Sequence, residues 1–347
     1  MTDTAPGPAL GEPRLSLPLC ILLTAVLALT GCGEPRPYKE TRFMMGTLVE
    51  VSVYAPEKAA VQAVSRAFDR MAQLERVAHA GHEDSPLARL RRGEAVVLEG
   101  DLARILEAGM AVARASSGAF DPAMGELVDL WGLSMDRPRR PSDGEIGEAL
   151  ARKAGLALPS GACCPGGAPV WMDLGGVAKG YAVDMAVELL VDAGVASGVV
   201  NAGGDLRTFG RRPGRGIWKI GIQDPDSPQE LAGVLQVGQL SVATSGDYQR
   251  YFEEDGVRYH HILDPATGYP ARSGLRSVTV LAPDCVTADA LATAVFVLGA
   301  EKGMKLLEGW PGAEGVLIKE DGTVLLTGGI GDGIRFERAG KGIRDQG

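Results

Sequence analysis

Residues 170–184 contain the feature that most constrains this chain, a glycine-rich turn with an acid before it and a lysine inside it. The apolar residues 170–172 predict a short buried strand. Apolar residues at helical spacing over residues 179–191 predict a helix that Gly194 ends. Glycine lets the backbone approach a ligand closely, and the amides that open a helix favour an anion. The turn therefore predicts an anion site, for which phosphate is the best candidate.

The glycine spacing of this turn excludes two common phosphate-binding motifs. The Walker motif needs Gly-Lys followed by Ser or Thr, whereas Lys179 precedes Gly180 and Tyr181 here. The dinucleotide fingerprint needs Gly-x-Gly-x-x-Gly, whereas these glycines are at positions 175, 176 and 180. On the glycines alone, a turn used only for tight packing is an equally good interpretation.

The composition of the 347-residue chain is that of a soluble globular protein, with 45% hydrophobic and 23% charged residues. Its formal net charge is -9, and the sequence contains no dense run of Lys and Arg. A nucleic-acid surface needs a basic patch. We therefore expect no nucleic-acid partner.

The N-terminal residues resemble the signal peptide of a bacterial lipoprotein. An apolar run over residues 15–29 follows Arg14, and small residues then directly precede Cys32. The run is short for a membrane span, and small residues before a cysteine are what a lipidation site requires. We predict a signal peptide over residues 1–31 and Cys32 as the lipidated first residue of the mature chain. An ordinary secretory signal and an N-terminal membrane helix are the alternatives.

A lipidated Cys32 predicts that the protein is anchored to a bacterial membrane on the periplasmic side. We expect the inner membrane. Gly33 follows the cysteine, and no aspartate that would mark retention in the inner membrane stands there, so sorting to the outer membrane is the alternative.

Strands and helices are predicted along the mature chain without an internal repeat. Alternating valines predict a strand over residues 47–54, and apolar residues at helical spacing predict a helix over residues 61–74. Asp101 has the position of an N-cap for a second helix. Further strands are expected at residues 198–200, 217–223, 235–237 and 276–281, with a hairpin around Asp321-Gly322.

Residues 287–298 are predicted to form a helix in which Asp289 and Thr293, four residues apart, share one face. A carboxylate and a hydroxyl suit Mg²⁺, which takes its other ligands from water and substrate phosphates. Alone, the pair is better explained by an Asp favoured by the helix dipole and a Thr bonded to its own backbone.

Seven segments taken together resemble the motifs of the ApbE family, the FAD:protein FMN transferases. In family order they are residues 45–47, 118–122, 173–180, 201–205, 243–246, 261–268 and 287–293. Each motif is weak singly, but seven in order exclude chance, and the similarity extends over essentially all of the mature chain. The resemblance implies an α+β fold, a single T-fold-like domain over residues 32–347 with FAD between two subdomains.

The activity implied by the resemblance is a Mg²⁺-dependent transfer. The enzyme cleaves FAD, attaches FMN through a phosphoester bond to a Thr or Ser hydroxyl of a partner flavoprotein, and releases AMP. We expect that partner to belong to a membrane electron-transfer complex. An enzyme that hydrolyses FAD to FMN and AMP is the alternative within the family, and a non-catalytic flavin-binding lipoprotein is the alternative outside catalysis.

The resemblance also assigns residues to roles. Asp289 and Thr293 would hold the metal together with the backbone carbonyl of Gly176, and Asp289 is thereby catalytic. His261 is the candidate base for the acceptor hydroxyl, although a histidine beside a turn is also a common structural hydrogen-bonder. The residues that would line the FAD site are Met45, Ala119, Phe120, Asp121, Asp173, Lys179 and Ile262.

One region departs from the family pattern. Relatives carry an aromatic residue ahead of a serine and an asparagine shortly after it, whereas residues 79–91 contain no such aromatic and have Arg91 at the asparagine position. The departure changes the contacts expected with the outer part of FAD. The residues expected to bind the metal and the pyrophosphate are present.

Replacing Cys32 tests the predicted anchor. Cys32→Ser removes the thiol that would carry the lipid, so the variant should be released from the membrane fraction. Intact mass spectrometry of the parent should show a diacylglyceryl mass on Cys32. A parent cut at another residue, or a lipid that persists in the variant, would contradict the prediction.

Overall fold

The computed structural model describes residues 36–133, 137–154, 163–164, 167–331 and 333–339, so the predicted signal peptide and Cys32 lie outside the described residues. All described elements belong to one unit, Arg36–Gly347. Among the described residues, no helix is both long and apolar enough to cross a membrane.

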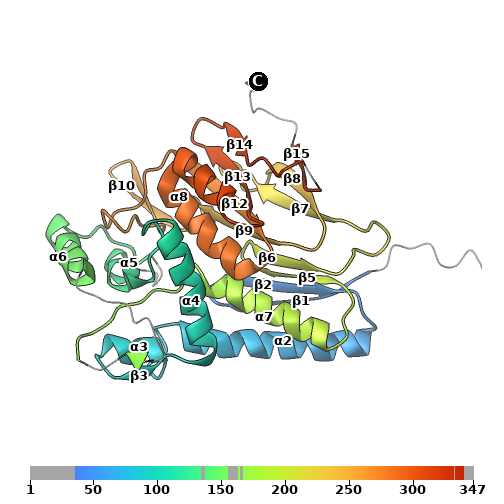
Figure 1. Cartoon of the computed structure of the whole chain (residues 1–347), viewed down its shortest axis with the longest axis horizontal. Helices are drawn as coiled ribbons and strands as arrows, with labels where there is room; N and C mark the ends of the chain where they lie inside the picture. Colours follow the sequence, from blue (N-terminus) through green and yellow to red (C-terminus); the bar gives the residue numbers. More distant parts are fainter. Residues whose placement is uncertain (1–35, 134–136, 155–162, 165–166, 332, 340–347) are drawn as a thin grey trace, which may run out of the picture. The chain divides into compact units, whose positions relative to one another are not determined.

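An eight-stranded antiparallel sheet organises this unit (Figure 1). Its strands, in spatial order, are β1 (Tyr38–Met44), β2 (Thr47–Val53), β5 (Gly198–Ala202), β6 (Asp205–Phe209), β9 (Ser241–Gly246), β12 (Leu275–Ala282), β13 (Glu314–Lys319) and β14 (Val324–Leu326). Central strands such as β9 and β12 are buried at nearly every position, because both faces of the sheet are covered.

Helices cover one face of the sheet. Helix α8 (Cys285–Glu308) packs on β9 and β12, α7 (Ala178–Asp192) packs on β5 and β6, and α2 (Glu57–Ala78) packs against α7. Helix α4 (Gly100–Ala115) lies against α8. Both α7 and α8 have few charged residues and are buried on more than one side, as expected for helices inside a large core.

A smaller sheet covers the opposite face. It has the order β15 (Arg335–Arg338), β8 (Leu231–Val237) and β7 (Trp218–Gln223). Trp218 and Leu235 of this sheet form one apolar cluster with Val242, Leu281 and Ile318 of the large sheet. The architecture is therefore a layer of helices, a large antiparallel sheet and a small sheet, which confirms the α+β prediction.

A third group of elements packs around Trp131. They are α5 (Gly125–Trp131), α6 (Asp143–Ala154), β10 (Tyr251–Glu254) and β11 (Val257–His260). The indole of Trp131 is fully buried, and its Nε1 donates to the carbonyl of Gly268 at 2.8 Å. The remaining elements are α3 (Pro86–Arg91), η1 (Pro122–Met124), β3 (Val96–Val97) and β4 (Cys163–Cys164).

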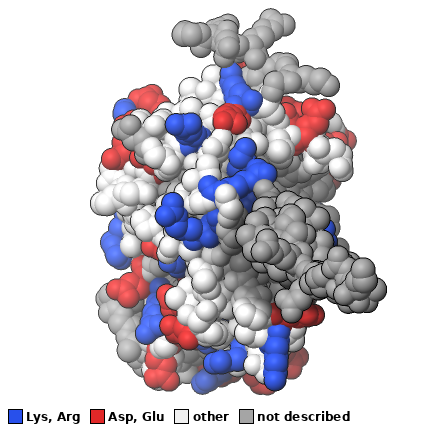
Figure 2. Space-filling view, turned by 90° about the vertical axis from the view of Figure 1, so that its right-hand side faces the viewer, with Lys and Arg blue, Asp and Glu red and all other residues white. Residues whose placement is uncertain are grey.

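Charged side chains of both signs are spread over the face shown in Figure 2. The excess of acidic residues in the sequence is therefore not gathered into a single patch on that face.

Two local predictions are wrong. Residues 170–172 form no strand, and their backbone is instead held by loops: the Gly125 N–H donates to the Trp171 carbonyl at 3.2 Å. A short apolar run does not distinguish a strand from a buried loop. Asp101 lies in the first turn of α4 and not at its N-cap, which is Glu99, and its carboxylate accepts from Arg70 at 2.6 Å.

The N-terminal turns of α7 and α8 touch each other. A Cβ at Gly180 would lie 2.3 Å from the carbonyl oxygen of Cys285, so only glycine allows this approach. The carboxylate of Asp184 accepts from the amides of Cys285 and Val286, both at 2.9 Å, which ties the start of α8 to α7. Arg207 pairs with the same carboxylate at 2.7 Å.

Substitution of Gly180 tests this contact. Gly180→Ala forces the two helices apart, so the free energy of unfolding should fall by about 1–3 kcal/mol, the usual cost of overpacking. Gly147→Ala is the matched control, because a Cβ at that position in α6 would meet nothing within 4 Å. The control should gain about 0.5–1 kcal/mol from the loss of a glycine in a helix. Equal stability of both variants in urea titrations would contradict the assigned contact.

Candidate active site

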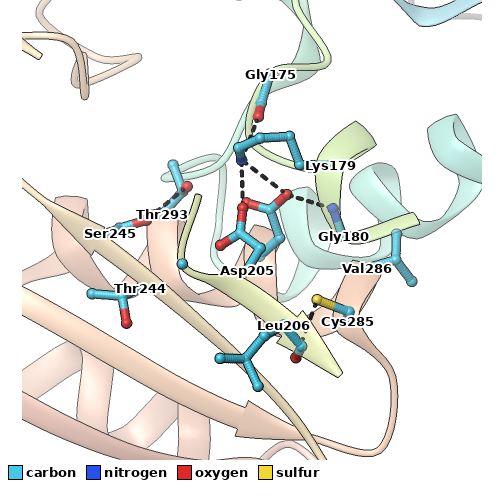
Figure 3. A network of polar contacts seen from close by, with 12 residues as sticks. Gly175, Lys179, Gly180, Asp205, Leu206, Thr244, Ser245, Cys285, Val286 and Thr293 are labelled. Atoms are coloured by element: carbon cyan, nitrogen blue, oxygen red, sulfur yellow. Dashed lines mark hydrogen bonds and ion pairs between the residues drawn. The ribbon is translucent and has the colours of Figure 1, made fainter. Parts of the chain in front are cut away.

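A lysine and two carboxylates meet where α7, β6 and α8 come together (Figure 3). The Nζ atom of Lys179 lies 2.6 Å from Oδ2 of Asp205 and 3.5 Å from Oδ2 of Asp289. It also lies 3.3 Å from the carbonyl oxygen of Gly175. The two carboxylate side chains are each 5% exposed. With all three groups ionised the cluster carries one excess negative charge, which favours a further cation beside it.

Each charged group in this cluster shifts the pKa of its neighbours. Burial alone would lower the pKa of Lys179, but the carboxylates of Asp205 and Asp289 outweigh it and raise that pKa, so the ammonium stays charged. Burial raises the pKa of Asp289, and the charge of Asp205 raises it further. The Gly180 N–H donates to Oδ2 of Asp289 at 3.0 Å and opposes this effect.

The three predicted metal-binding groups are adjacent. Asp289 and Thr293 are one turn apart on α8, and Oγ1 of Thr293 lies 3.3 Å from Oγ of Ser245. A Cβ at Gly176 would lie 3.2 Å from Oγ1 of Thr293 and 3.1 Å from the ring of Phe120. The backbone of Gly176 therefore packs directly against the threonine hydroxyl.

These groups fit a hard divalent cation. They offer a carboxylate, a hydroxyl and a backbone carbonyl, all of them oxygen donors. Within the described residues there is no group of three or more His, Cys, Asp or Glu side chains placed to hold a metal ion. A cation held here would thus depend on few protein ligands, which is usual for Mg²⁺ on a phosphate substrate.

The predicted FAD-lining residues on two loops lie side by side. The Asp173 N–H donates to the Pro122 carbonyl at 2.9 Å, which joins the loop before α7 to the loop containing Ala119, Phe120 and Asp121. Phe120 is buried against Gly176. The carboxylate of Asp121 caps η1 and lies 2.5 Å from Nζ of Lys153, which the sequence analysis did not identify. Asp121 therefore fixes the shape of its loop.

Met45 lies at the tip of the β1–β2 hairpin. Met45 and Gly46 have φ values of 52° and 69°, the left-handed pair that a two-residue hairpin turn requires. A positive φ is costly for methionine, and the Met45 N–H is held by Oε1 of Glu75 at 2.8 Å. The turn therefore keeps Met45 in a conformation that the local sequence alone disfavours.

Arg250 connects this hairpin to His261. Its Nη2 donates to the Gly46 carbonyl at 2.9 Å, and its own carbonyl accepts from the His261 N–H at 3.1 Å. Sequence reasoning missed Arg250, because nothing in the spacing around it indicates either partner. The arrangement places the predicted base beside the β1–β2 hairpin.

The two adjacent histidines have different environments. His260 is 2% exposed, and both ring nitrogens are used by the backbone: Nε2 donates to the Ala271 carbonyl at 2.9 Å, and Nδ1 accepts from the buried Ile262 at 3.3 Å. His261 is half-buried, with Nδ1 at 3.3 Å from the Arg250 carbonyl. A carbonyl only accepts, so Nδ1 carries the proton and Nε2 keeps a lone pair.

Burial lowers the pKa of His261, and the positive charge of Arg250 lowers it further. The imidazole of His261 is therefore neutral near pH 7. A neutral ring with its Nδ1 proton fixed on a carbonyl can accept a proton at Nε2.

The departure from the family pattern has a structural role. Arg91 lies 2.8 Å from Oδ2 of Asp129, and its guanidinium lies over the ring of Trp171, 5.0 Å from the centroid. Trp171 is two residues before Asp173. Arg91 therefore stabilises the start of the loop that carries Asp173. Sequence reasoning missed this contact, because Arg91 and its partners are distant in the chain.

Comparison with known proteins identifies the family. The sequence profile of the ApbE family matches residues 45–317. The chain belongs to the ApbE family. A relative from Treponema pallidum (strain Nichols), named FAD:protein FMN transferase, is 39% identical over 353 residues, covering 93% of this chain and 95% of its own length. The homologues are thus named as transferases, which confirms the predicted enzyme class.

Solved structures of the family share the fold. The structure of the ApbE protein from Thermotoga maritima has a TM-score of 0.78 and 35% identity, covering 84% of this chain and 97% of its own. The apo form of the flavinyl transferase ApbE from Pseudomonas stutzeri has a TM-score of 0.74 and 29% identity, covering 86% and 97% respectively. The α+β fold is therefore that of ApbE proteins.

The buried state of His260 predicts how stability depends on pH. Burial lowers its pKa from the ordinary 6.5 to about 4, so the unfolded chain binds this proton more tightly than the folded one. The stabilisation is fully present above pH 6.5 and is lost as the pH falls toward 4, by about 1.4 kcal/mol per pH unit.

His260→Gln removes this titration. Between pH 7 and pH 5, the parent should lose about 2 kcal/mol more free energy of unfolding than the variant does. His82→Gln is the control, because His82 is exposed, and it should follow the parent. If His260→Gln and the parent depend on pH in the same way, His260 is not held neutral by burial.

Proposed function

We propose that this chain is an Mg²⁺-dependent FAD:protein FMN transferase. It cleaves FAD, attaches FMN through a phosphoester bond to a Thr or Ser hydroxyl of a partner flavoprotein, and releases AMP. The observation that carries the proposal is the meeting of Asp289, Thr293 and the backbone of Gly176 beside the charged Lys179. The names of the ApbE relatives support the flavin substrate and the protein acceptor.

Asp289, Thr293 and the carbonyl of Gly176 are the groups that would hold Mg²⁺. When bound, the cation neutralises charge on the pyrophosphate and makes AMP a better leaving group. Lys179 adds a second positive charge at the same place, because its pKa is raised and its side chain is 27% exposed. The amides of Ala178 and Tyr181 at the start of α7 donate to backbone carbonyls, and the Gly180 amide donates to Asp289, so the positive charge at this turn comes from Lys179.

The FAD molecule would be bound by the segments that carry Met45, Ala119, Phe120, Asp121, Asp173 and Ile262. The loops of Phe120 and Asp173 are joined by a hydrogen bond, and Phe120 packs on Gly176, so these two loops lie beside the lysine turn. Fixing the substrate on rigid loops brings the reacting phosphorus near the acceptor and reduces the entropic part of the barrier.

His261 would act on the acceptor. Its neutral ring has the lone pair on Nε2, which takes the proton from the acceptor hydroxyl while that oxygen attacks the phosphorus of the FMN half. The bond from this phosphorus to the bridging oxygen breaks, and AMP leaves with that oxygen. Arg250 keeps the ring in this tautomer through its carbonyl.

We further propose that the protein acts on the periplasmic side of the inner membrane, anchored by a lipid on Cys32, and that its acceptor belongs to a membrane electron-transfer complex. The proposal is supported by the apolar run and small residues that precede Cys32. A tethered enzyme meets membrane-bound acceptors at a raised effective concentration.

The function is tested by incubating the mature protein with FAD, Mg²⁺ and a peptide that carries a Ser/Thr-Gly-Ala-Thr acceptor site. Intact mass should show FMN added to the peptide, together with AMP. Asp289→Ala removes the charged metal ligand and should lower transfer by orders of magnitude. His261→Ala should lower it by about 10²- to 10⁴-fold, the usual effect of losing a general base, while FAD still binds.

His260→Ala is the control for His261→Ala, because both ring nitrogens of His260 are used by the backbone. If transfer is lost in the His260 variant and not in the His261 variant, the base is His260 and the assignment to His261 is wrong. Free FMN with AMP and an unmodified peptide would show an FAD pyrophosphatase instead. Unchanged transfer in folded Asp289→Ala would contradict the metal site.

A further inference from the structure

We propose that Asp205 is a positioning residue that draws the Lys179 ammonium away from Asp289, so that Asp289 remains able to bind a divalent cation. The inference rests on the proposed metal site and adds a role for a buried carboxylate that the mechanism does not otherwise use. Asp205 acts here through Lys179 and does not touch the cation.

The distances show where the ammonium is held. Nζ of Lys179 is 2.6 Å from Asp205 and 3.5 Å from Asp289, so the short ion pair is with Asp205 (Figure 3). In the described part of the chain, Lys179 is the one basic side chain paired with either carboxylate. A single ammonium is thus shared unequally between two buried acids.

The fold fixes Asp205 in this position. It is the first residue of β6 and follows the two-residue turn Gly203-Gly204. The Gly204 N–H donates to Oδ1 of Asn201 at 2.9 Å, and Gly203 packs against Thr47 of β2. The carboxylate is therefore held by the central sheet, whereas Lys179 is a long side chain that can move between partners.

A cation at Asp289 and the Lys179 ammonium compete for the same carboxylate oxygen region. Without Asp205, the ammonium would find its remaining partner in Asp289, and a cation would have to displace it. With Asp205 present, the ammonium already has a closer partner and remains near the pyrophosphate as a second positive charge. Asp205 thus resolves a competition that the two positive charges would otherwise create.

Two other roles for Asp205 give different results. If the carboxylate bound the cation directly, or only added negative charge to the site, removing it would weaken cation binding whether or not Lys179 is present. If it acts through Lys179, its removal matters only when the lysine is there. A double-mutant cycle separates these cases.

The experiment measures Mn²⁺ binding to the mature protein by electron paramagnetic resonance, without FAD and without an activity readout. Asp205→Asn should weaken Mn²⁺ binding by about tenfold or more, because the ammonium then pairs with Asp289. Lys179→Met removes the competitor and should bind at least as tightly as the parent. In the Lys179→Met background, Asp205→Asn should change the affinity by less than about twofold.

Asp247→Asn is the matched control, because this carboxylate is also buried and ion-paired but its partner is Arg276 of β12, away from the start of α7 and α8. It should leave Mn²⁺ affinity within about twofold of the parent. An equal loss in Asp247→Asn would overturn the inference. The same loss from Asp205→Asn in the parent and in the Lys179→Met background would also overturn it, and so would an Asp205→Asn variant that binds Mn²⁺ as tightly as the parent.

Failure of the proposed function gives a different pattern. If the parent binds no Mn²⁺, or if Asp289→Ala binds it as tightly as the parent, the metal site itself is wrong and the inference is overturned with it. Parent binding that depends on Asp289 but not on Asp205 would overturn the positioning role alone.

Discussion

The contact between the N-terminal turns of α7 and α8 is the constraint on which the rest of the site depends. Gly180 allows the close approach, and Asp184 bonds the first amides of α8. This contact brings the Gly180 amide within 3.0 Å of Asp289 and places Lys179 beside the same carboxylate. Neither helix alone would form the cluster, because Lys179 on α7 and Asp289 on α8 are 110 residues apart in the chain.

The site combines groups that are held firmly with one that can move. Asp205 is held by the central sheet, and Asp289 by a buried helix, whereas Lys179 reaches between them on a flexible stem. The neighbouring histidines show the same division: the backbone uses both nitrogens of His260, but only one of His261. Preorganised groups of this kind lose little energy to rearrangement during a reaction.

Much of the fold and part of the site could be predicted from local patterns. The pair Asp289 and Thr293 follows from four-residue spacing on a helix, which the structure confirms. The interpretation of residues 170–172 as a strand is wrong, because periodicity does not identify the loops that hold them. Arg250 and the partner of Lys179 in β6 were missed for the same reason: their roles depend on contacts between distant segments.

The central claim is that a divalent cation binds among Asp289, Thr293 and the Gly176 carbonyl. It is tested most directly by anomalous X-ray diffraction from crystals of the mature protein soaked with Mn²⁺. The account predicts one strong peak at coordination distance, about 2 Å, from oxygens of all three residues. A peak bound by other residues, with none at this position, would contradict it.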